Sequence, residues 1–270
     1  MARPLILGIV NITADSFSDG GHYLDPAAAI ARALLLVQEG ADIIDLGPAA
    51  SNPDAEPVSP AQEIARLTPV VAALRPKGIP LSIDSFQPET QAFALSQGVH
   101  YLNDIQGFPE PAHYPRLAES TAKLIVMHSV QGRGQADKRE VAPEEIMGRI
   151  FSFFDARLSA LEGAGIARER LIIDPGMGFF LGTNPQTSLS VLRGLQALGQ
   201  RYRLPVLVSV TRKSFLRQLV GASIASSGPV SLAAELFAAT QGVAMIRTHD
   251  PRALRDGLTL WAAAGARIGP

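Results

Sequence analysis

The sequence predicts an α/β fold with one domain over residues 1–270, a single TIM (β/α)8 barrel. Eight short apolar runs rich in Val, Ile and Leu recur along the 270 residues, and a segment with helical spacing follows each of them. The runs are apolar throughout instead of alternating with polar residues, which is typical of parallel strands covered on both faces. No repeat or linker divides the chain, and α/β barrels of about 250 residues form one domain.

The expected strands and helices alternate along the whole chain. The strands are predicted at 5–13, 41–47, 80–85, 99–105, 123–129, 171–176, 205–210 and 244–250. The helices are predicted at 27–39, 60–74, 88–97, 111–120, 143–163, 184–202, 213–219 with 229–240, and 251–264. Several helices begin with a polar residue before proline, as at Asp25-Pro26, Ser59-Pro60 and Gln87-Pro88, which favours a helix start because proline needs no N–H partner there.

A doubly wound parallel sheet is the alternative fold. That fold usually carries the glycine fingerprint GxGxxG at its first strand-to-helix turn. The corresponding turn here has only Gly20-Gly21. The barrel is therefore the favoured prediction.

Composition excludes several classes of function. The chain has 24 Lys+Arg and 25 Asp+Glu, so it has no broad basic field for nucleic acid or anionic membranes, and small molecules are the expected ligands. The absence of cysteine excludes a disulfide, a thiolate nucleophile and a Cys-ligated zinc. No apolar run approaches the roughly 18 residues of a membrane span. The N-terminal segment has no signal-peptide pattern, so we expect a cytoplasmic protein.

Polar residues gather at the predicted C-terminal ends of the strands. They are Asn11, Asp45, Asp84, Asn103, Asp104, His128, Asp174, Arg247 and His249. A single polar residue at such a position is usually a helix cap or loop anchor. In a barrel, however, all these strand ends meet at one face, which is the face that carries catalysis in this architecture.

The types of these residues suggest what they bind. The carboxylates and amide of Asp84, Asn103 and Asp174 suit a flat, nitrogen-rich heterocycle such as a pterin or purine. The segment 211–214, Thr-Arg-Lys-Ser, places cations at a helix start, where an anion would bind. Arg247 and His249 alternate along the last strand and, with Asn11, form a second candidate anion pocket. A ring site flanked by two anion sites indicates transfer between an anionic leaving group and an anionic acceptor.

Several segments resemble, in order, the successive signatures of the dihydropteroate synthase family. They are NITADSFSDGG (11–21), VSPAQEI (58–64), IDSFQPET (83–90), YLNDI (101–105), DPGMGF (174–179), VSVTRKSF (208–215) and IRTHD (246–250). The resemblance implies a folate-pathway transferase that joins 7,8-dihydropterin-6-ylmethyl pyrophosphate to p-aminobenzoate and releases pyrophosphate with the help of Mg²⁺. It also implies a homodimer.

The resemblance assigns residues to three groups. The pterin is assigned to Asp84, Asn103, Asp174 and Lys213, with Met127 as an apolar wall, Arg212 stacked on the ring and Asp45 supporting the site from below. The pyrophosphate is assigned to Asn11, Arg247 and His249, and Asn11 also faces Mg²⁺. The p-aminobenzoate carboxylate is assigned to Ser214, and its pocket to two loops, 13–21 with Thr13 and Phe17, and 48–55 with Ser51.

The chain also departs from the family pattern. Its second loop reads GPAASNPDAEPV (47–58) where the family usually reads GGESTRPGAEPV, so Ser51 replaces a threonine and Asn52 an arginine. The aromatic pair Phe179-Phe180 follows the sixth strand. These features resemble the acquired, sulfonamide-insensitive branch of the family, and we expect the pair either to gate the p-aminobenzoate pocket or simply to pack.

Arg168 and Arg170, before the sixth strand, are expected to be solvent-exposed charges on the opposite face of the barrel.

The alternative function is a barrel module that binds a pterin or a methylated folate without synthase activity. The cationic segments at 211–214 and 246–250 argue against that alternative, because such a module has no pyrophosphate to release.

Overall fold

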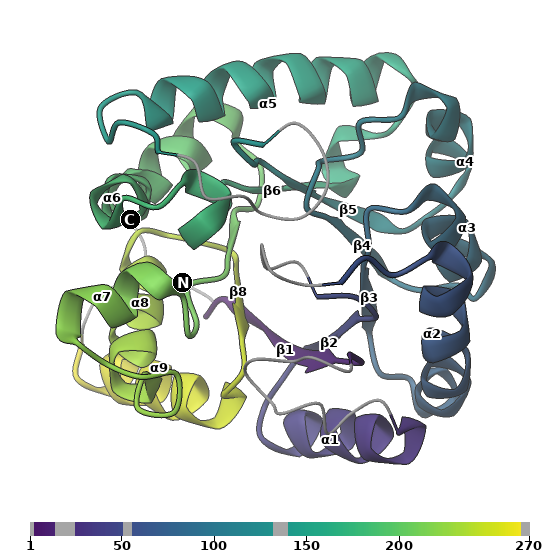
Figure 1. Ribbon diagram of the computed structural model, residues 1–270, viewed down its shortest axis with the longest axis horizontal. Helices are drawn as coiled ribbons and strands as arrows, with labels where there is room; N and C mark the ends of the chain where they lie inside the picture. The colour runs from purple at the N-terminus through teal and green to yellow at the C-terminus, as the bar shows by residue number, and fades with distance from the viewer. Residues whose placement is uncertain (1–2, 14–24, 51–55, 132–139, 266–270) are drawn as a thin grey trace.

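The computed structural model describes residues 3–13, 25–50, 56–131 and 140–265. In these residues the strands form one parallel sheet that curves into a barrel, with helices around it (Figure 1). The strands are β1 (Leu5–Asn11), β2 (Ile43–Gly47), β3 (Leu81–Asp84), β4 (Tyr101–Asp104), β5 (Lys123–Met127), β6 (Leu171–Asp174), β7 (Leu207–Val208) and β8 (Met245–Thr248). Each lies within a predicted run, so the predicted (β/α)8 fold is confirmed.

The order of the strands distinguishes the barrel from the alternative fold. The sheet runs β6-β5-β4-β3-β2-β1-β8-β7, so β1 pairs with both β2 and β8. A single bridge between Ile173 and Val206 joins β6 to the β7 side, and the Ile173 N–H donates to the carbonyl oxygen of Pro205 at 3.0 Å. The ends of the sheet therefore meet, which a doubly wound sheet does not allow.

Three helices begin at the prolines of the predicted pairs Asp25-Pro26, Ser59-Pro60 and Gln87-Pro88. The helices are α1 (Pro26–Gln38), α2 (Pro60–Leu74), α3 (Pro88–Ser96), α4 (Tyr114–Glu119), α5 (Ile146–Gly163), α6 (Pro185–Tyr202), α7 (Ser214–Val220), α8 (Gly228–Thr240) and α9 (Pro251–Ala263). Short 3-10 turns are η1 (Arg75–Lys77), η2 (Pro111–His113), η3 (Arg168–Arg170) and η4 (Gly178–Leu181). Asp25 accepts the N–H of Ala27, and Ser59 forms a capping box with Gln62. No helix in the described ranges is both long and apolar enough to cross a bilayer.

Side chains along each strand point in turn to the inside of the barrel and to the helices, which gives two separate apolar layers. An inner cluster fills the barrel, whereas a larger cluster lies between the strands and the helices. On β1, for example, Leu7 belongs to the inner cluster and the neighbouring Ile6 to the outer one. Because successive side chains point to opposite faces of a strand, both layers demand apolar residues, and the strands are apolar throughout.

Arg170 is not a free surface charge, so that expectation was wrong. Its guanidinium donates to the carbonyl oxygens of Leu117, Ala118 and Ala122 at 2.8, 3.3 and 2.9 Å, and to the Ser120 hydroxyl at 2.8 Å. These carbonyls lie at and beyond the end of α4, where helical partners are lacking. Arg170 therefore caps the C-terminal end of the short α4 although it lies about 50 residues further along the chain, and local sequence cannot show such a contact.

Candidate active site

The predicted ring-site residues continue the inward-facing rows of the barrel. Asp45, Met127, Asp174 and Arg247 each lie two positions beyond a residue of the inner apolar cluster on the same strand. Side chains two apart on a strand share a face, so all four point to the barrel axis at its C-terminal end. Strand pairing also places Asp84 beside Asn103 and Met127 beside Asp174.

Arg247 is the centre of the charge arrangement. Its Nε donates to Oδ2 of Asp45 at 2.6 Å, and its Nη2 donates to Oδ2 of Asp84 at 2.8 Å. Asp45 is fully buried, whereas Asp84 remains 18% exposed and so can reach a ligand. Arg247, which is expected to hold the leaving group, is thus paired with Asp84, which is expected to hold the ring. The two expected subsites are therefore neighbours.

Burial changes the acidity of the site carboxyl groups. It raises the pKa of Asp84 to about 7, although Arg247 opposes the rise, and the pKa of Asp174 to about 6, although a hydrogen bond from the Gly176 N–H opposes it. The Gly176 N–H donates to Asp174 at 2.8 Å. Both carboxyl groups therefore hold a proton more readily than an exposed carboxyl group does.

Lys213 lies against the loop that follows β6. Its ammonium is 5.2 Å from the centre of the Phe180 ring, a cation–π arrangement. Gly178, which has a φ of +68°, allows the close approach, because a Cβ there would lie 3.2 Å from Lys213 Cδ. Burial, followed by the charge of Arg247, lowers the pKa of Lys213 to about 8. Lys213 therefore releases its proton more readily than an exposed lysine does, and it stays close to the loop after β6.

His249 lies at the other side of the rim, next to the turn after β7. Its Nδ1 is 3.1 Å from the Thr211 hydroxyl, and Arg32 donates to its backbone carbonyl at 2.8 Å. Burial, and then the charges of Arg212, Arg247, Lys213 and Arg32, lower the pKa of His249 well below its ordinary value. His249 is therefore neutral at neutral pH and can serve an anion by hydrogen bonding instead of by charge.

Several buried polar atoms around this site have no hydrogen-bond partner among the described residues. They are Thr13 Oγ1, Asp45 Oδ1, Ser82 Oγ, Asn103 Oδ1 and Ser209 Oγ. An unsatisfied buried polar atom is costly unless a ligand or water completes its bonding, and these atoms all belong to the strands of the barrel or to the residues that directly follow them. The oxygen of Asn103 is an acceptor that fits a donor on a nitrogen-rich ring.

An apolar wall faces these polar groups. Ile105, Met127 and Phe180 form a small buried cluster, against which Phe86 and Phe179 pack. Met127 belongs to this cluster, and its role as a wall for the ring stays a prediction. The sequence did not single out Ile105 and Phe86, which join Met127 in this cluster, although each is the first large apolar residue after a polar rim residue.

The structure places the remaining predicted residues as follows. Asn11 ends β1, and a Cβ on Gly47 would lie 3.4 Å from its Oδ1 and 4.0 Å from Asp84 Oδ2, so the amide and the carboxylate flank the same glycine. Ser214 begins α7, and Arg212 has a φ of 55° with its N–H donating to Ser231. Phe17 and Ser51, with Asn52, lie outside the described residues.

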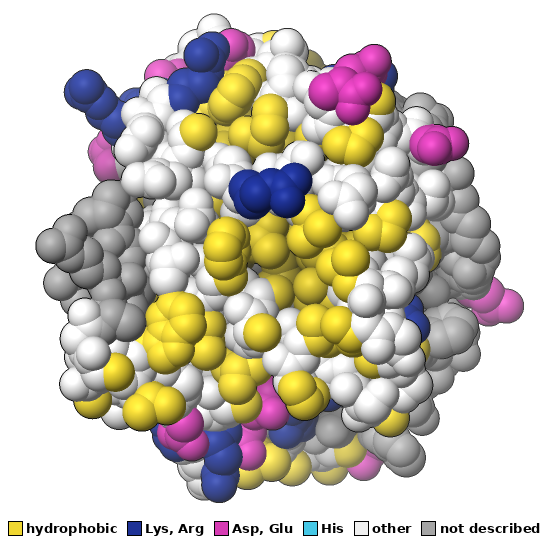
Figure 2. Space-filling model, turned by 90° about the vertical axis from the view of Figure 1, so that its left-hand side faces the viewer, with side chains coloured by type: hydrophobic (Ala, Val, Ile, Leu, Met, Phe, Trp, Pro, Cys, Tyr) yellow, Lys and Arg dark blue, Asp and Glu magenta, His cyan; other side chains and the backbone are white. Residues whose placement is uncertain are grey.

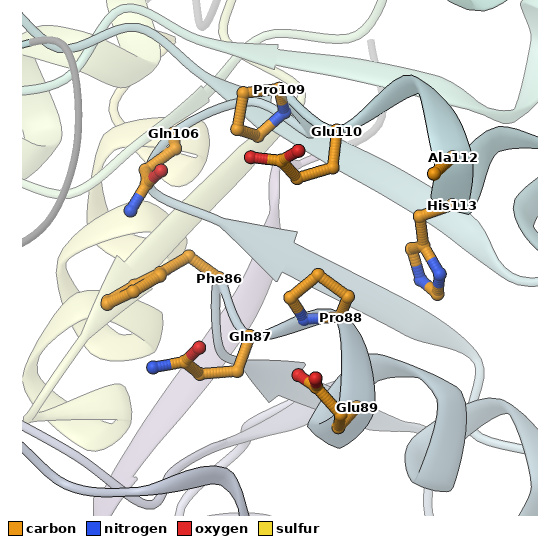
Figure 3. Close-up of a pocket in the computed structure, with 9 residues that line it drawn as sticks. All are labelled: Phe86, Gln87, Pro88, Glu89, Gln106, Pro109, Glu110, Ala112 and His113. Carbon is orange, nitrogen blue, oxygen red and sulfur yellow. The ribbon is translucent and has the colours of Figure 1, made fainter.

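A hollow of about 500 Å³ opens at the rim beyond β3 and β4. Figure 3 shows Phe86, Gln87 and Pro88 on one side of it and Pro109 and Glu110 on the other. A narrow extension below it is lined by Gln91 and Asp104. The hollow is therefore the space where the chains leaving these two strands separate.

The barrel and its rim define the class of protein: a (β/α)8 protein with buried carboxylates and cations gathered at the C-terminal ends of its strands. A family model described as pterin binding enzyme matches residues 7–249. The dihydropteroate synthase type-2 of Escherichia coli is 64% identical over 259 residues, which cover 96% of this chain and 95% of that protein.

Solved structures agree with this match. The Yersinia pestis dihydropteroate synthase in a sulfonamide drug complex superposes with a TM-score of 0.88 at 32% identity, covering 97% of this chain and 94% of that one. The Xanthomonas albilineans dihydropteroate synthase in complex with 7,8-dihydropteroate gives 0.84 at 34% identity, covering 98% and 95%. This chain belongs to the dihydropteroate synthase family of pterin binding enzymes, as its motifs predicted.

Proposed function

We propose that this chain joins 7,8-dihydropterin-6-ylmethyl pyrophosphate to p-aminobenzoate, giving 7,8-dihydropteroate and pyrophosphate. The observation that carries the proposal is the convergence of Asp84, Asp174, Lys213 and the unsatisfied Asn103 oxygen at one end of the barrel. Family membership supplies the reaction, and the Xanthomonas relative is described in complex with its product.

The residues divide the work of a dissociative reaction. The bond between the methylene carbon and the pyrophosphate oxygen breaks first, the electron pair leaves with the pyrophosphate, and the dihydropterin ring delocalises the positive charge. Asp84 and Asp174 favour the cationic ring, and Arg247 favours the departing anion. The arylamine nitrogen then attacks the carbon and loses a proton. Met127 walls the ring, Lys213 and Asn103 hold its polar edge, and Arg212 stacks on it.

Asn11, Arg247 and His249 hold the pyrophosphate in this proposal, with Mg²⁺ as the cofactor. No cluster of three or more acidic or histidine residues in the described parts of the chain could hold a metal. Mg²⁺ commonly uses one or two protein oxygens and completes its shell with phosphates and water. The oxygen of Asn11 fits that requirement, and bound Mg²⁺ would supply charge neutralisation to the leaving group.

Ser214 is the proposed partner of the p-aminobenzoate carboxylate, and Thr13, Phe17 and Ser51 belong to the loops that would complete its pocket. The aromatic pair Phe179-Phe180 bears on selectivity. A sulfonamide carries a tetrahedral sulfur and an extra substituent where p-aminobenzoate carries a planar carboxylate. A wall beyond the carboxylate can therefore reject the drug and still accept the substrate.

The two phenylalanines are not equivalent. Phe180 is 6% exposed and packs with Met127 and Lys213, whereas Phe179 is only partly buried. We infer that Phe179 is the outer wall, that Phe180 supports it, and that the enzyme is poorly inhibited by sulfonamides. Phe179→Ala should lower the inhibition constant of sulfamethoxazole by about tenfold or more, while the KM of p-aminobenzoate stays within about threefold. If an active Phe179→Ala variant is as insensitive to sulfamethoxazole as the wild type, the insensitivity would instead be assigned to Ser51 and Asn52.

A homodimer in the cytoplasm completes the proposal. Hydrophobic side chains gather on the face that carries α7, α8 and α9 (Figure 2), and the large exposed ones there include Leu219, Val220, Phe237 and Leu260. Apolar patches of this kind mark protein interfaces. Phe237→Glu should yield monomers in sedimentation velocity, while Leu35→Glu, at an exposed position on α1, should not.

A pyrophosphate-release assay separates this function from the alternative. With both substrates and Mg²⁺, the enzyme should release one pyrophosphate for each dihydropteroate formed. Tight binding of a pterin without release of pyrophosphate would instead support a module that only binds a pterin or a methylated folate. The same assay without p-aminobenzoate is the control for simple hydrolysis.

A further inference from the structure

Gln91 connects two strand ends that carry ring-site residues. It lies on α3, is 2% exposed, and uses its Nε2 twice. Nε2 donates to the carbonyl oxygen of Ser85 at 2.8 Å and to Oδ2 of Asp104 at 2.8 Å. Ser85 directly follows Asp84, and Asp104 directly follows Asn103. The Gln91 carboxamide thus connects Ser85, which follows Asp84, to Asp104, which follows Asn103.

The place of this connection is where the strands part. Asp84 and Asn103 are paired, and the Ser85 N–H donates to the Asn103 carbonyl at 3.0 Å. Beyond this bond the two chains run on opposite sides of the hollow, as Phe86 and Gln106 show in Figure 3. The Gln91 amide therefore acts where the chains that follow β3 and β4 separate. A small change in the distance between these two chains there would move the Asp84 and Asn103 side chains relative to each other.

Both ends of the connection are fixed by further hydrogen bonds. The Ser85 hydroxyl donates to the buried carboxylate of Glu63 on α2 at 2.6 Å. Asp104 is 1% exposed, and its Oδ1 accepts the Gln106 N–H at 2.7 Å. Burial raises the pKa of Asp104 to about 6, while the hydrogen bonds from Gln106 and Gln91 oppose the rise. Loss of the Gln91 amide would remove one of the hydrogen bonds that the buried Asp104 carboxylate accepts, the others coming from the N–H groups of Gln106 and Phe108, and it would free Ser85 and Asp104 to move apart.

We propose that Gln91 is a positioning residue for ring recognition, which sets the separation of the Asp84 and Asn103 side chains by tying Ser85 to Asp104. The inference rests on the proposed function for the identity of the ring. It adds a residue that cannot touch the substrate, because Gln91 lies below the rim and both of its amide hydrogen bonds are made within the protein.

The test replaces Gln91 with methionine, which keeps the length of the side chain and removes both donors. Binding of 6-hydroxymethyl-7,8-dihydropterin should weaken by about three- to tenfold, the usual effect of one or two lost hydrogen bonds. The KM of the pterin pyrophosphate should rise by the same factor, and the KM of p-aminobenzoate should stay within about twofold. Gln97→Met is the matched control, since Gln97 ends the same helix and its amide donates to Ser96.

A second variant keeps the proposal falsifiable if Gln91→Met folds poorly. The double variant Gln91→Met, Asp104→Asn removes the donor and the buried charge together, so that no unpaired carboxylate remains, and it should show the same loss of pterin binding. Unchanged pterin affinity in either folded variant would overturn the proposal. An equal rise in both KM values with a lower Tm would also overturn it, because it would mean support of the fold alone. Pterin binding is measured without turnover. A failure of the proposed synthase function can therefore be told apart from a failure of the proposal for Gln91.

Discussion

Arg247 joins Asp45 to Asp84 through two different nitrogens, and only one of the two acids is accessible. The fully buried Asp45 holds Nε, whereas the partly exposed Asp84 holds Nη2. In the proposed function, a ring bound to Asp84 would share that carboxylate with Arg247, whose Nη2 contacts only Oδ2, and the guanidinium would stay anchored to Asp45.

Arg247→Ala should abolish turnover and also destabilise the protein by about 3–5 kcal/mol, because it leaves a buried carboxylate without its counter-ion. The double variant Asp45→Asn, Arg247→Ala should recover much of the stability in urea unfolding and none of the turnover. Recovery of neither would mean that the ion pair is not the source of the instability. Recovery of both would mean that Arg247 does not serve the leaving group.

Asp84→Asn should weaken binding of a pterin monophosphate analogue by roughly 1.5–3 kcal/mol, the range for a hydrogen bond to a charged group. Titration calorimetry measures this loss directly. Asp256→Asn, at an exposed position in α9, is the control. Unchanged affinity in a folded Asp84→Asn enzyme would remove Asp84 from the ring site.

Glu235 should make the folded state less stable as the pH rises. It is buried on α8, accepts a hydrogen bond from the Thr248 hydroxyl, and burial raises its pKa from 4.5 to about 8. Below pH 4.5 the carboxyl group is neutral in both folded and unfolded chains. Between pH 4.5 and about 8 only the unfolded chain releases the proton, so stability falls, at about 1.4 kcal/mol per unit of pKa shift.

Glu235→Gln should therefore flatten this part of the stability profile. Urea unfolding at pH 5, 6, 7 and 8 measures it, with Glu119→Gln, at the exposed end of α4, as the control. If wild type and Glu235→Gln lose stability in parallel across this range, then Glu235 ionises in the folded protein as it does in the unfolded one.

Arg170→Met should destabilise the barrel without changing either KM. The substitution removes the guanidinium donors from the carbonyls of Ala118 and Ala122, which costs about 1–3 kcal/mol for each buried group that water does not reach, whereas the Leu117 carbonyl keeps its bonds from Ser120. Thermal unfolding measures the loss, and Arg193→Met on the exposed side of α6 is the control. A Tm equal to that of the control would mean that water replaces the guanidinium.

The sequence by itself determined the elements and their order. Apolar runs fixed the strands, and polar-proline pairs such as Ser59-Pro60 fixed helix starts, because both signals act over a few residues of the chain. The ends of elements were less certain: the helix expected from residue 143 begins at Ile146, and the run at 205–210 keeps only Leu207–Val208 as strand. The rim residues were predictable because every parallel strand of a barrel ends at the same face.

Only the tertiary structure decided which of those residues contact one another. Arg247 and Asp45 are far apart in sequence and meet because β8 and β2 both flank β1. Arg170 closes α4, and Gln91 ties two strand ends, through bonds that no local pattern encodes. A hydrogen bond depends on distance and direction in space, whereas periodicity reports only which face a residue shares, so the sequence placed the residues on one rim and the packing of the barrel paired them.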